Sequence, residues 1–454
     1  RIRFGLPQLA PRATPAQLRQ PVPFSTASLT VFDPSTRSPK TNQWGLSVQR
    51  EIGRGFVAEV NYIGRRAVGL YGAYDANQVN VFARDPRFNE SYLEAFNTLR
   101  ANSTATSPLI NALLTGNPAT NAGSAQFRTL FTTALAQGSI AATAISLSQR
   151  TVNGRRVVAD NGFPFFFQPF PQFTGALNVI DTNDYSTYHG LETQITRRTG
   201  RGLLLQASYT FAKSLDTRSF DPAFTIAGRT TSGTNASPAA ANTPLDNRDR
   251  SLNYARSDFD RRHALQGYVV YDLPFGRGKR FLGDAPGVVN QLVGGWELAS
   301  SFILQSGRPF TVYSRIFSVS NAVLSPASCN GCTPDMAGLV QETGGTYFIF
   351  SAEERARFFD PAPGQLGNTG RNAFTGPRYF NMDLAVRKRF YFGEVRNLEF
   401  RADISNLTNT PSFDHPLAST SSIASGTFGR IRPTSSGEIS SSSRRIQLGL
   451  KFNF

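Results

Sequence analysis

Apolar and polar residues alternate along nine segments of the chain, each about ten residues long. In the last of these segments every second residue from Ile446 to Phe454 is apolar, and the residues between them are polar or small. A period of two is typical of a β-strand with one apolar face and one polar face. The predicted strands are Trp44–Ile52, Phe56–Ile63, Tyr188–Arg198, Leu203–Lys213, Arg262–Leu273, Val293–Gln305, Met382–Phe390, Leu398–Asn406 and Arg445–Phe454.

Short and long connections alternate between the predicted strands. Gly-containing links such as Gly53-Arg54-Gly55 join the strands in pairs, and Gly adopts the positive φ that tight hairpins require. The pairs are separated by long connections rich in Ser, Thr, Asn, Gly and Pro, at about 64–187, 214–261, 306–381 and 407–444. Structureless connections of that length are unusual in a compact soluble domain. Short turns on one side and long loops on the other are typical of outer-membrane barrels. We therefore predict an all-β fold, an antiparallel transmembrane β-barrel portion of about nine or more strands, with short periplasmic turns and long extracellular loops.

Two stretches lack the alternation. Ser91–Leu114, within the loop insertion 64–187, has helical spacing at Tyr92, Phe96 and Leu99, which predicts a short helix packed in that loop. Residues Arg1–Lys40 are rich in Pro, so we place them outside the membrane as well. Residue 1 is Arg and no signal segment follows, so we expect the first residues to be the cut end of a longer protein.

The two faces of the predicted sheet differ in composition. In a barrel the apolar face meets lipid and the polar face lines the lumen, whereas in a soluble sandwich the apolar face meets a second sheet. Polar-face positions include charges of both signs, which suits a hydrated interior: Glu192, Gln194, Asp383, Arg387, Glu399, Arg401 and Asp403. Aromatic residues gather near strand ends, as in the interfacial girdles of membrane barrels. These aromatic residues are Trp44, Tyr62, Tyr188, Tyr209, Tyr271, Trp296, Phe390 and Phe454. The alternative interpretation is that these aromatic residues are ordinary strand residues of a large soluble β-protein.

Composition and charge narrow the class of protein. The 454 residues include 37 Phe and 14 Tyr, and hydrophobic residues make up 40%, so the chain has enough apolar material for a large β-structure. No window is long and apolar enough for a transmembrane helix. The net charge of +16 raises the question of nucleic acid. The Arg residues are scattered singly, without a basic helix or tail, so anionic outer-membrane lipid or a polyanionic cell surface fits the charge at least as well. We expect no nucleic-acid partner.

Five blocks of sequence resemble a known family when they are taken together. They are "QWGLSVQREIGRGFVAEVNYIG" (43–64), "YHGLETQITRRTGRGLLLQASYTFAKSLD" (188–216), "SDFDRRHALQGYVVYDLPFGRGKRF" (257–281), "NLEFRADISNLTNTPSFDHP" (397–416) and "FGRIRPTSSGEISSSSRRIQLGLKFNF" (428–454). The blocks are similar to the C-terminal barrel of TonB-dependent outer-membrane receptors. The nearest subgroup is the one whose members begin with a carboxypeptidase-regulatory-like domain. The resemblance extends over residues 1–454, and the plug and N-terminal domains of such receptors have no counterpart in it.

The resemblance implies a location in the cell outer membrane and several partners. The terminal strand looks like an assembly signal for the barrel-assembly machinery, carried by Ile446, Leu448, Leu450, Phe452 and Phe454. Such receptors take up or bind a large or scarce extracellular ligand and are energised by the TonB complex through the plug, which this chain lacks. A surface adhesin or structural barrel, which binds partners through its loops without transport, is the alternative. The sequence does not identify the ligand, because the residues that select it would lie in the long loops and the plug.

Candidate chemical motifs have simple structural interpretations. Cys329-Asn330-Gly331-Cys332 lies in a Ser/Pro/Gly-rich loop without the following helix of a thioredoxin-like site, so we predict a small loop disulfide. The three His residues, His189, His263 and His415, are far apart in sequence and predict no metal site.

The other motifs do not indicate a ligand either. The cluster from Asp258 to His263 is interpreted as a strand that enters the barrel rim with compensating charges. Asp246, Asn247 and Asp249 lack the spacing of an EF-hand. The Gly-Arg-Gly triplets are interpreted as turns rather than as RNA-binding repeats. We find no catalytic motif and no cofactor motif, and we expect no enzyme activity.

Overall fold

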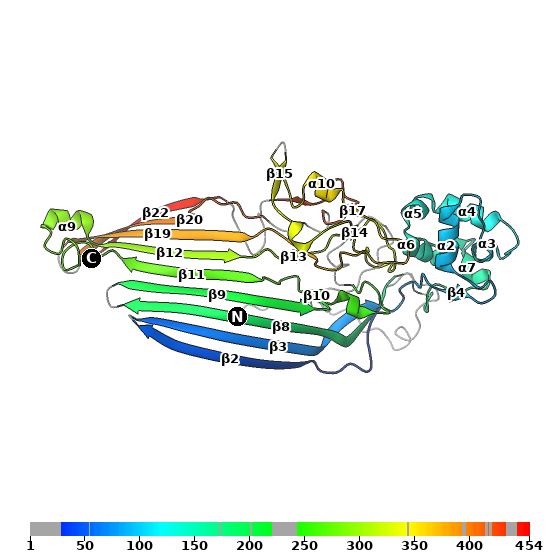
Figure 1. Ribbon diagram of the computed structural model, residues 1–454, viewed down its shortest axis with the longest axis horizontal. Coiled ribbons are helices and arrows are strands. Elements are labelled where there is room, and N and C mark those ends of the chain that lie inside the picture. Colours follow the sequence, from blue (N-terminus) through cyan, green and yellow to red (C-terminus); the bar gives the residue numbers. More distant parts are fainter. Residues whose placement is uncertain are drawn as a thin grey trace, which may run out of the picture.

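The computed structural model is dominated by one large antiparallel sheet (Figure 1). It describes residues 29–53, 55–171, 173, 175–199, 202–219, 243–342, 345–392, 396–413, 416, 420–432 and 443–454. The main strands follow one another across the sheet in chain order, and each is antiparallel to its neighbours. The strands are β2 (Lys40–Gly53), β3 (Phe56–Asp75), β8 (Leu177–Thr199), β9 (Leu203–Asp216), β11 (His263–Asp272), β12 (Trp296–Gln305), β19 (Tyr379–Phe392), β20 (Arg396–Ser405) and β22 (Arg445–Asn453).

Each of the nine alternating segments forms one of these strands, because a period-two pattern places all apolar side chains on one face of the sheet. The boundaries of the first long loop, 64–187, were wrong. β3 continues to Asp75 and β8 begins at Leu177, so the connection spans 76–176. In the part of β3 that follows Ile63 the alternation is lost, because the pairing of β3 with β8 contains irregularities between Val68 and Gly72 that shift the register.

The short connections lie at the end of the sheet that also carries the C-terminus, on the left of Figure 1. Gly53, Gly55, Gly202, Gly276 and Gly278 all have positive φ, between 74° and 101°, which confirms that the described parts of the Gly-Arg-Gly triplets are turns. The link between β11 and β12 is longer than the others and contains α9 (Gly287–Val293).

The sheet is open in the described part of the chain. β2 pairs with β3, β22 pairs with β20, and the outer edges of β2 and β22 have no partner strand there. Two short strands join the sheet beside the main path: β1 (Leu29–Phe32), which is parallel to β8, and β10 (Ala255–Arg256), which is antiparallel to β9. Residues 1–40, which the sequence analysis places outside the membrane, thus contribute Leu29–Phe32 to the sheet, and residues 1–28 lie outside the described residues.

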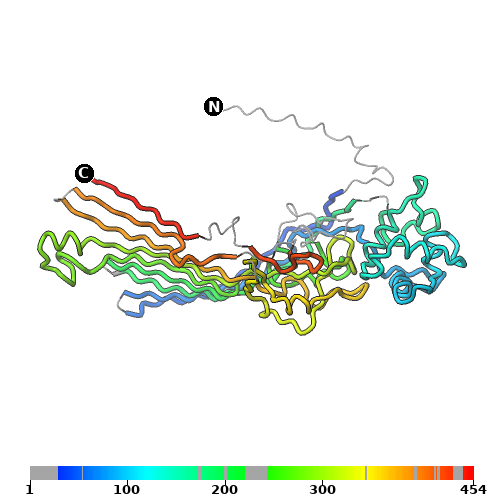
Figure 2. The backbone as a smooth tube through the Cα atoms, turned by 90° about the horizontal axis from the view of Figure 1, so that it is seen from above, coloured from blue at the N-terminus to red at the C-terminus, as the bar shows by residue number. Residues whose placement is uncertain are grey.

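The connection 76–176 folds into a cluster of helices at the far end of the molecule from the C-terminus (Figures 1 and 2). The expected single helix at Ser91–Leu114 is two helices, α2 and α3, because Asn102 ends the first, and Ser107 caps the second before Pro108. Tyr92, Phe96 and Leu99 are buried as their spacing predicted. The helices are α2 (Tyr92–Ala101), α3 (Pro108–Thr115), α4 (Ala122–Leu130), α5 (Thr132–Gln137), α6 (Ile140–Gln149) and α7 (Val157–Asp160), with the small strands β4 (Arg84–Asp85), β5 (Glu90–Ser91), β6 (Thr151–Val152) and β7 (Arg155–Arg156).

A second group of loops packs between the sheet and the helical cluster. Its apolar core includes Phe310, Phe350, Phe358, Phe374 and Phe428, whose rings meet at centroid distances of 5.2–6.1 Å. Its short elements are η1 (Arg250–Asn253), β13 (Pro309–Phe310), β14 (Ser328–Cys329), η2 (Pro334–Met336), β15 (Val340–Glu342), β16 (Thr346–Phe348), α10 (Ala352–Arg355), β17 (Phe358–Phe359), β18 (Phe374–Thr375) and β21 (Arg430–Ile431). No described helix of the chain has the length and apolar character needed to cross a membrane.

Candidate functional site

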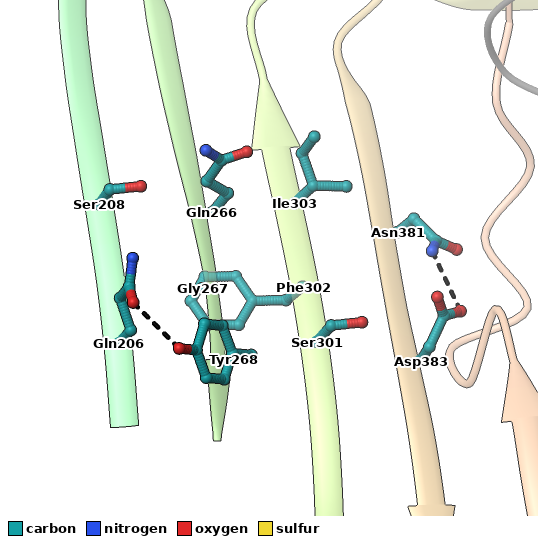
Figure 3. Close-up of a pocket in the computed structure, with 10 residues that line it drawn as sticks. All are labelled: Gln206, Ser208, Gln266, Gly267, Tyr268, Ser301, Phe302, Ile303, Asn381 and Asp383. Carbon is teal, nitrogen blue, oxygen red and sulfur yellow. Dashed lines mark hydrogen bonds between the residues drawn. The ribbon is translucent and has the colours of Figure 1, made fainter. Parts of the chain in front are cut away.

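The polar face of the sheet contains a hollow of about 320 Å³ in the middle of β9, β11, β12 and β19 (Figure 3). The strand register brings its side chains together, because Ser208 lies opposite Gln266 and Ser301 lies opposite both Tyr268 and Asp383. The other polar-face residues that line the hollow are Gln206, Ile303 and Asn381. A second hollow of about 490 Å³ shares Tyr268, Ser301 and Asp383 and continues toward Arg387 and Arg401.

Hydrogen bonds orient part of this lining. The hydroxyl of Tyr268 donates to Oε1 of Gln206 at 3.0 Å, and Nδ2 of Asn381 donates to Oδ1 of Asp383 at 3.1 Å (Figure 3). The side-chain amide of Gln266 has no hydrogen bond within the residues that the structure describes. An amide offers both donors and an acceptor, so Gln266 can bind a polar group of a ligand.

Several charged residues on the same face are paired with one another. Arg387 Nη1 lies 2.7 Å from Glu297 Oε1, and Arg389 Nε lies 2.9 Å from Glu399 Oε2. Arg401 Nε lies 2.7 Å from Asp403. These charges neutralise one another. Asp383 is the charged residue that lines the first hollow, and its Oδ1 accepts hydrogen bonds from Nδ2 of Asn381 and from the backbone N–H of Asn406.

The opposite face of the sheet carries apolar side chains, several of which no described residue covers. Leu46, Val48, Leu448 and Leu450 are 60–69% exposed. The register places Leu448 opposite Ala402 and Leu450 opposite Phe400, so the apolar parity of the two strands forms one surface. A contiguous exposed apolar surface of this kind is typical of contact with lipid.

The predicted aromatic girdle requires one correction. Tyr188 lies opposite Arg65 and Ser214, on the same parity as Glu192 and Gln194, and therefore belongs to the polar face. Near Tyr188 the strand continues toward the loops with polar residues on both faces. A position near a strand end therefore does not by itself determine which face an aromatic residue occupies. The other seven aromatic residues share the apolar parity of their strands.

A buried network of charges fixes the loops to the sheet. Arg371 Nη1 lies 2.8 Å from Asp216 at the end of β9, and its Nη2 lies 2.9 Å from Asp258. Burial alone lowers the pKa of Arg371, but Asp258 and Asp216 outweigh burial and hold the pKa above its ordinary value. A second pair, Arg218 and Asp184, is buried beside it. Asp258, the first residue of the charged cluster before β11, is thus compensated at the rim.

The predicted assembly residues lie together on the last strand. Ile446, Leu448, Leu450, Phe452 and Phe454 are all exposed, and the rings of Phe452 and Phe454 stack with centroids 6.2 Å apart. Their role in assembly stays a prediction. Cys329 and Cys332 are joined by a disulfide that lies in the second loop group.

The remaining candidate residues are separated. His189 and His263 lie on different strand pairs and each contacts a Tyr hydroxyl, at 2.8 and 2.7 Å, while His415 lies outside the described residues. Asp246 is paired with Arg248, and Asp249 accepts hydrogen bonds from Ser251. Within the described ranges, no three His, Cys, Asp or Glu residues are placed to hold a metal ion.

The residues of the hollow were missed as a group by sequence reasoning. Gln206, Gln266 and Tyr268 occupy the polar parity of predicted strands, so their face was predictable from the alternation, whereas Asn381 lies one residue before the predicted strand Met382–Phe390. Their grouping depends on the register between strands, which is set across connections of tens of residues.

Residues 3–447 match the protein family described as "Outer membrane beta barrel domain". The chain belongs to this outer-membrane β-barrel family. Its location is accordingly the outer membrane. No curated protein matches the sequence.

Two solved structures are similar to this barrel chain. The outer membrane transporter YddB from Escherichia coli has a TM-score of 0.38 and 9% identity, over 95% of this chain and 35% of that chain. BauA, the ferric preacinetobactin receptor from Acinetobacter baumannii, has a TM-score of 0.31 and 10% identity, over 93% and 32%. The barrel chain thus spans about a third of the length of each.

Proposed function

We propose that this chain is the barrel part of a TonB-dependent outer-membrane receptor that takes up a polar ligand through its lumen. The observation that carries the proposal is the hollow on the polar face, which combines the side-chain amide of Gln266, without a hydrogen bond among the described residues, with the carboxylate of Asp383. The neighbouring Arg387 and Arg389 are neutralised by Glu297 and Glu399. The five sequence blocks that resemble such receptors, including their carboxypeptidase-regulatory-like subgroup, support the same function. The ligand's hydrogen-bonding groups would replace water along this surface.

The experiment compares uptake with and without the energy source. Cells that express the intact protein receive a ¹³C-labelled cell hydrolysate, and mass spectrometry measures which compounds they accumulate. We expect accumulation of at least one polar compound to stop when TonB is deleted or a protonophore is added. The double variant Gln266→Ala/Asn381→Ala should lower that accumulation, whereas Gln447→Ala, on the same face but outside the hollow, should not. Accumulation that is independent of TonB would contradict the proposal.

A non-transporting adhesin is the second candidate, and exposed apolar residues in the first loop favour it. Phe165 is 66% exposed, Val152 is 50% exposed and Phe170 is 40% exposed, all on the loop side of the sheet. Large exposed apolar residues on an outer surface can bind a partner. In that case the cells would retain a surface-bound partner, the binding would survive the protonophore, and Phe165→Ser would weaken it.

A further inference from the structure

A hollow of about 750 Å³ lies where the second loop group overhangs β12 and β19. Its floor is formed by Leu304 and Phe380, which are paired across the two strands. Its roof is formed by loop residues, among them Leu339, Ile349 and Phe413. The walls are therefore mostly apolar, and the volume is in the range of pockets that enclose a small molecule or an alkyl chain.

The hollow is on the lipid side of the sheet. Leu304 and Phe380 have the same parity as Phe302 and Met382, which are paired one step further toward the turns. This is the apolar face, opposite to the lumen hollow of Figure 3. A molecule in the hollow would therefore come from the membrane rather than from the lumen.

The hollow lies at the loop-side rim of the apolar face, where side chains change from aliphatic to aromatic and ionisable. On β3 and β8, the hydroxyl of Tyr62 lies 2.8 Å from Nδ1 of His189, and on β9 and β11 the hydroxyl of Tyr209 lies 2.7 Å from Nδ1 of His263. Aromatic residues with a polar end favour the boundary between hydrocarbon and headgroups. The mouth of the hollow is thus placed near the headgroups of the outer leaflet.

One positive charge is available at the mouth. Arg378 lies two residues before Phe380, just ahead of the first residue of β19, and is the charged residue among those that line the hollow. Its guanidinium has no hydrogen bond or ion pair within the described residues, and its side chain is exposed. A guanidinium binds phosphate by two parallel hydrogen bonds, so Arg378 complements a phosphorylated headgroup.

We propose that this hollow binds a phosphorylated lipid of the outer leaflet, with an acyl chain against Leu304 and Phe380 and the phosphate on Arg378. The lipid would fill the space between the loops and the sheet and so hold the second loop group at the membrane surface. The charge complementarity, the apolar floor and the position at the rim of the lipid-facing surface all favour a membrane lipid over a water-soluble ligand.

The test measures lipid binding to the intact protein by native mass spectrometry. The protein in detergent is titrated with dioleoyl phosphatidic acid or with dioleoylglycerol, which has the same acyl chains and no phosphate, and heat-modifiable migration on gels verifies that each variant is folded. Arg378→Gln should weaken the first phosphatidic acid bound about fivefold, which is the effect of one Arg near an anionic lipid, and change the binding of dioleoylglycerol little. Leu339→Trp, which narrows the hollow, should weaken both lipids. Arg357→Gln, an exposed Arg of the same loops outside the hollow, is the matched control.

Each outcome decides the proposal. Unchanged binding in Arg378→Gln, or an equal loss in Arg357→Gln, would overturn it, because binding would then reflect general surface charge. Displacement of phosphatidic acid by excess inorganic phosphate would show a site for free phosphate instead. An unchanged affinity in Leu339→Trp would exclude the acyl chain from the hollow, and Leu339→Phe replaces this variant if the Trp variant does not fold.

Discussion

At the scale of single residues, the alternation determines which solvent each side chain meets. Leu448 and Phe400 share one face, and Gln447 lies opposite Asp403 on the other. An Arg at Leu448 should lower the free energy of unfolding by about 2–4 kcal/mol near the middle of the bilayer, because a charge would enter hydrocarbon. Gln447→Arg should cost much less, since the lumen side already holds Arg401. Unfolding in lipid vesicles gives the two values.

The facing is checked independently with fluorescent labels on single cysteines. Labels at Leu448 and Phe400 should be quenched by lipid-borne quenchers, and labels at Gln447 and Arg401 by aqueous ones. The reverse pattern would contradict the assignment of the faces.

Lys388 is an exception on the apolar face. It lies opposite Phe400, yet its Nζ donates to the backbone carbonyl of Gly294 and sits 5.4 and 4.9 Å from the ring centroids of Trp296 and Phe390. A long side chain near a membrane boundary can place its charge on polar groups while its stem stays in apolar contact.

Lys388→Ala should therefore destabilise the barrel by about 1–2 kcal/mol, through loss of two cation–π contacts and a hydrogen bond. The matched control is Lys451→Ala, because Lys451 is an exposed Lys on the polar face near the same end of the sheet. Vesicle unfolding measures both variants. Equal effects would show that Lys388 contributes only its charge.

At the scale of elements, the strands were predictable and the loops were not. The strands follow from a period of two that each segment carries by itself. The position of the helical cluster depends on long-range contacts, such as the hydrogen bond of 3.0 Å that the backbone N–H of Val79 donates to Oδ1 of Asn321. The attachment of the loops to the sheet depends on the ion pair of Arg371 with Asp216. Residues 242 and 155 positions apart cannot be paired from a local pattern.

The helical cluster shares one apolar core with Tyr313, Phe317 and Leu324 of the second loop group, apart from the main strands, so we expect this core to melt separately from the sheet. Phe96 is fully buried and packs with its ring centroid 6.2 Å from that of Phe127. Phe96→Ala should destabilise the cluster by about 3–5 kcal/mol and open it to protease, while the sheet stays heat-modifiable on gels. Leu130→Ala is the control, because Leu130 is 38% exposed. Loss of both units together in Phe96→Ala would show that they fold as one.

The last strand makes a prediction about assembly. Phe454 is 91% exposed and ends the apolar row of β22, which pairs with β20. If this row guides insertion by the barrel-assembly machinery, Phe454→Asp should lower the yield of folded protein in outer membranes severalfold, measured as the heat-modifiable fraction. Asn453→Asp, on the other parity, should leave the yield nearly unchanged. An undiminished yield in Phe454→Asp would refute a role of Phe454 in assembly.

At the scale of the whole molecule, the two edges of the sheet determine how it can be accommodated in the membrane. Every residue of β2 is exposed, and β2 and β22 have no second strand beside them within the described chain. Unpaired backbone groups are not tolerated in hydrocarbon, where each costs several kcal/mol. We therefore expect both edges to be paired in the outer membrane.

Hydrogen exchange of the intact protein in nanodiscs tests this expectation. The amides of β2 that point away from β3 should exchange as slowly as those of β9, which is paired on both sides. Exposed loop amides in the same sample serve as the fast reference. Rapid exchange along the outer edge of β2 would show that this edge is open.

The helical cluster also constrains how the protein reaches its final place. The connection 76–176 begins and ends at one point, because the backbone N–H of Ala76 donates to the carbonyl of Leu177 at 2.8 Å. A folded cluster with a buried core is far wider than two extended chain segments, so we expect the connection to cross the membrane unfolded and to fold only on the far side. Closing so long a connection costs conformational entropy, about 0.6 kcal/mol for each doubling of its length. The hairpins on either side of this connection should therefore form early, and the joining of β3 to β8 should limit the rate of biogenesis.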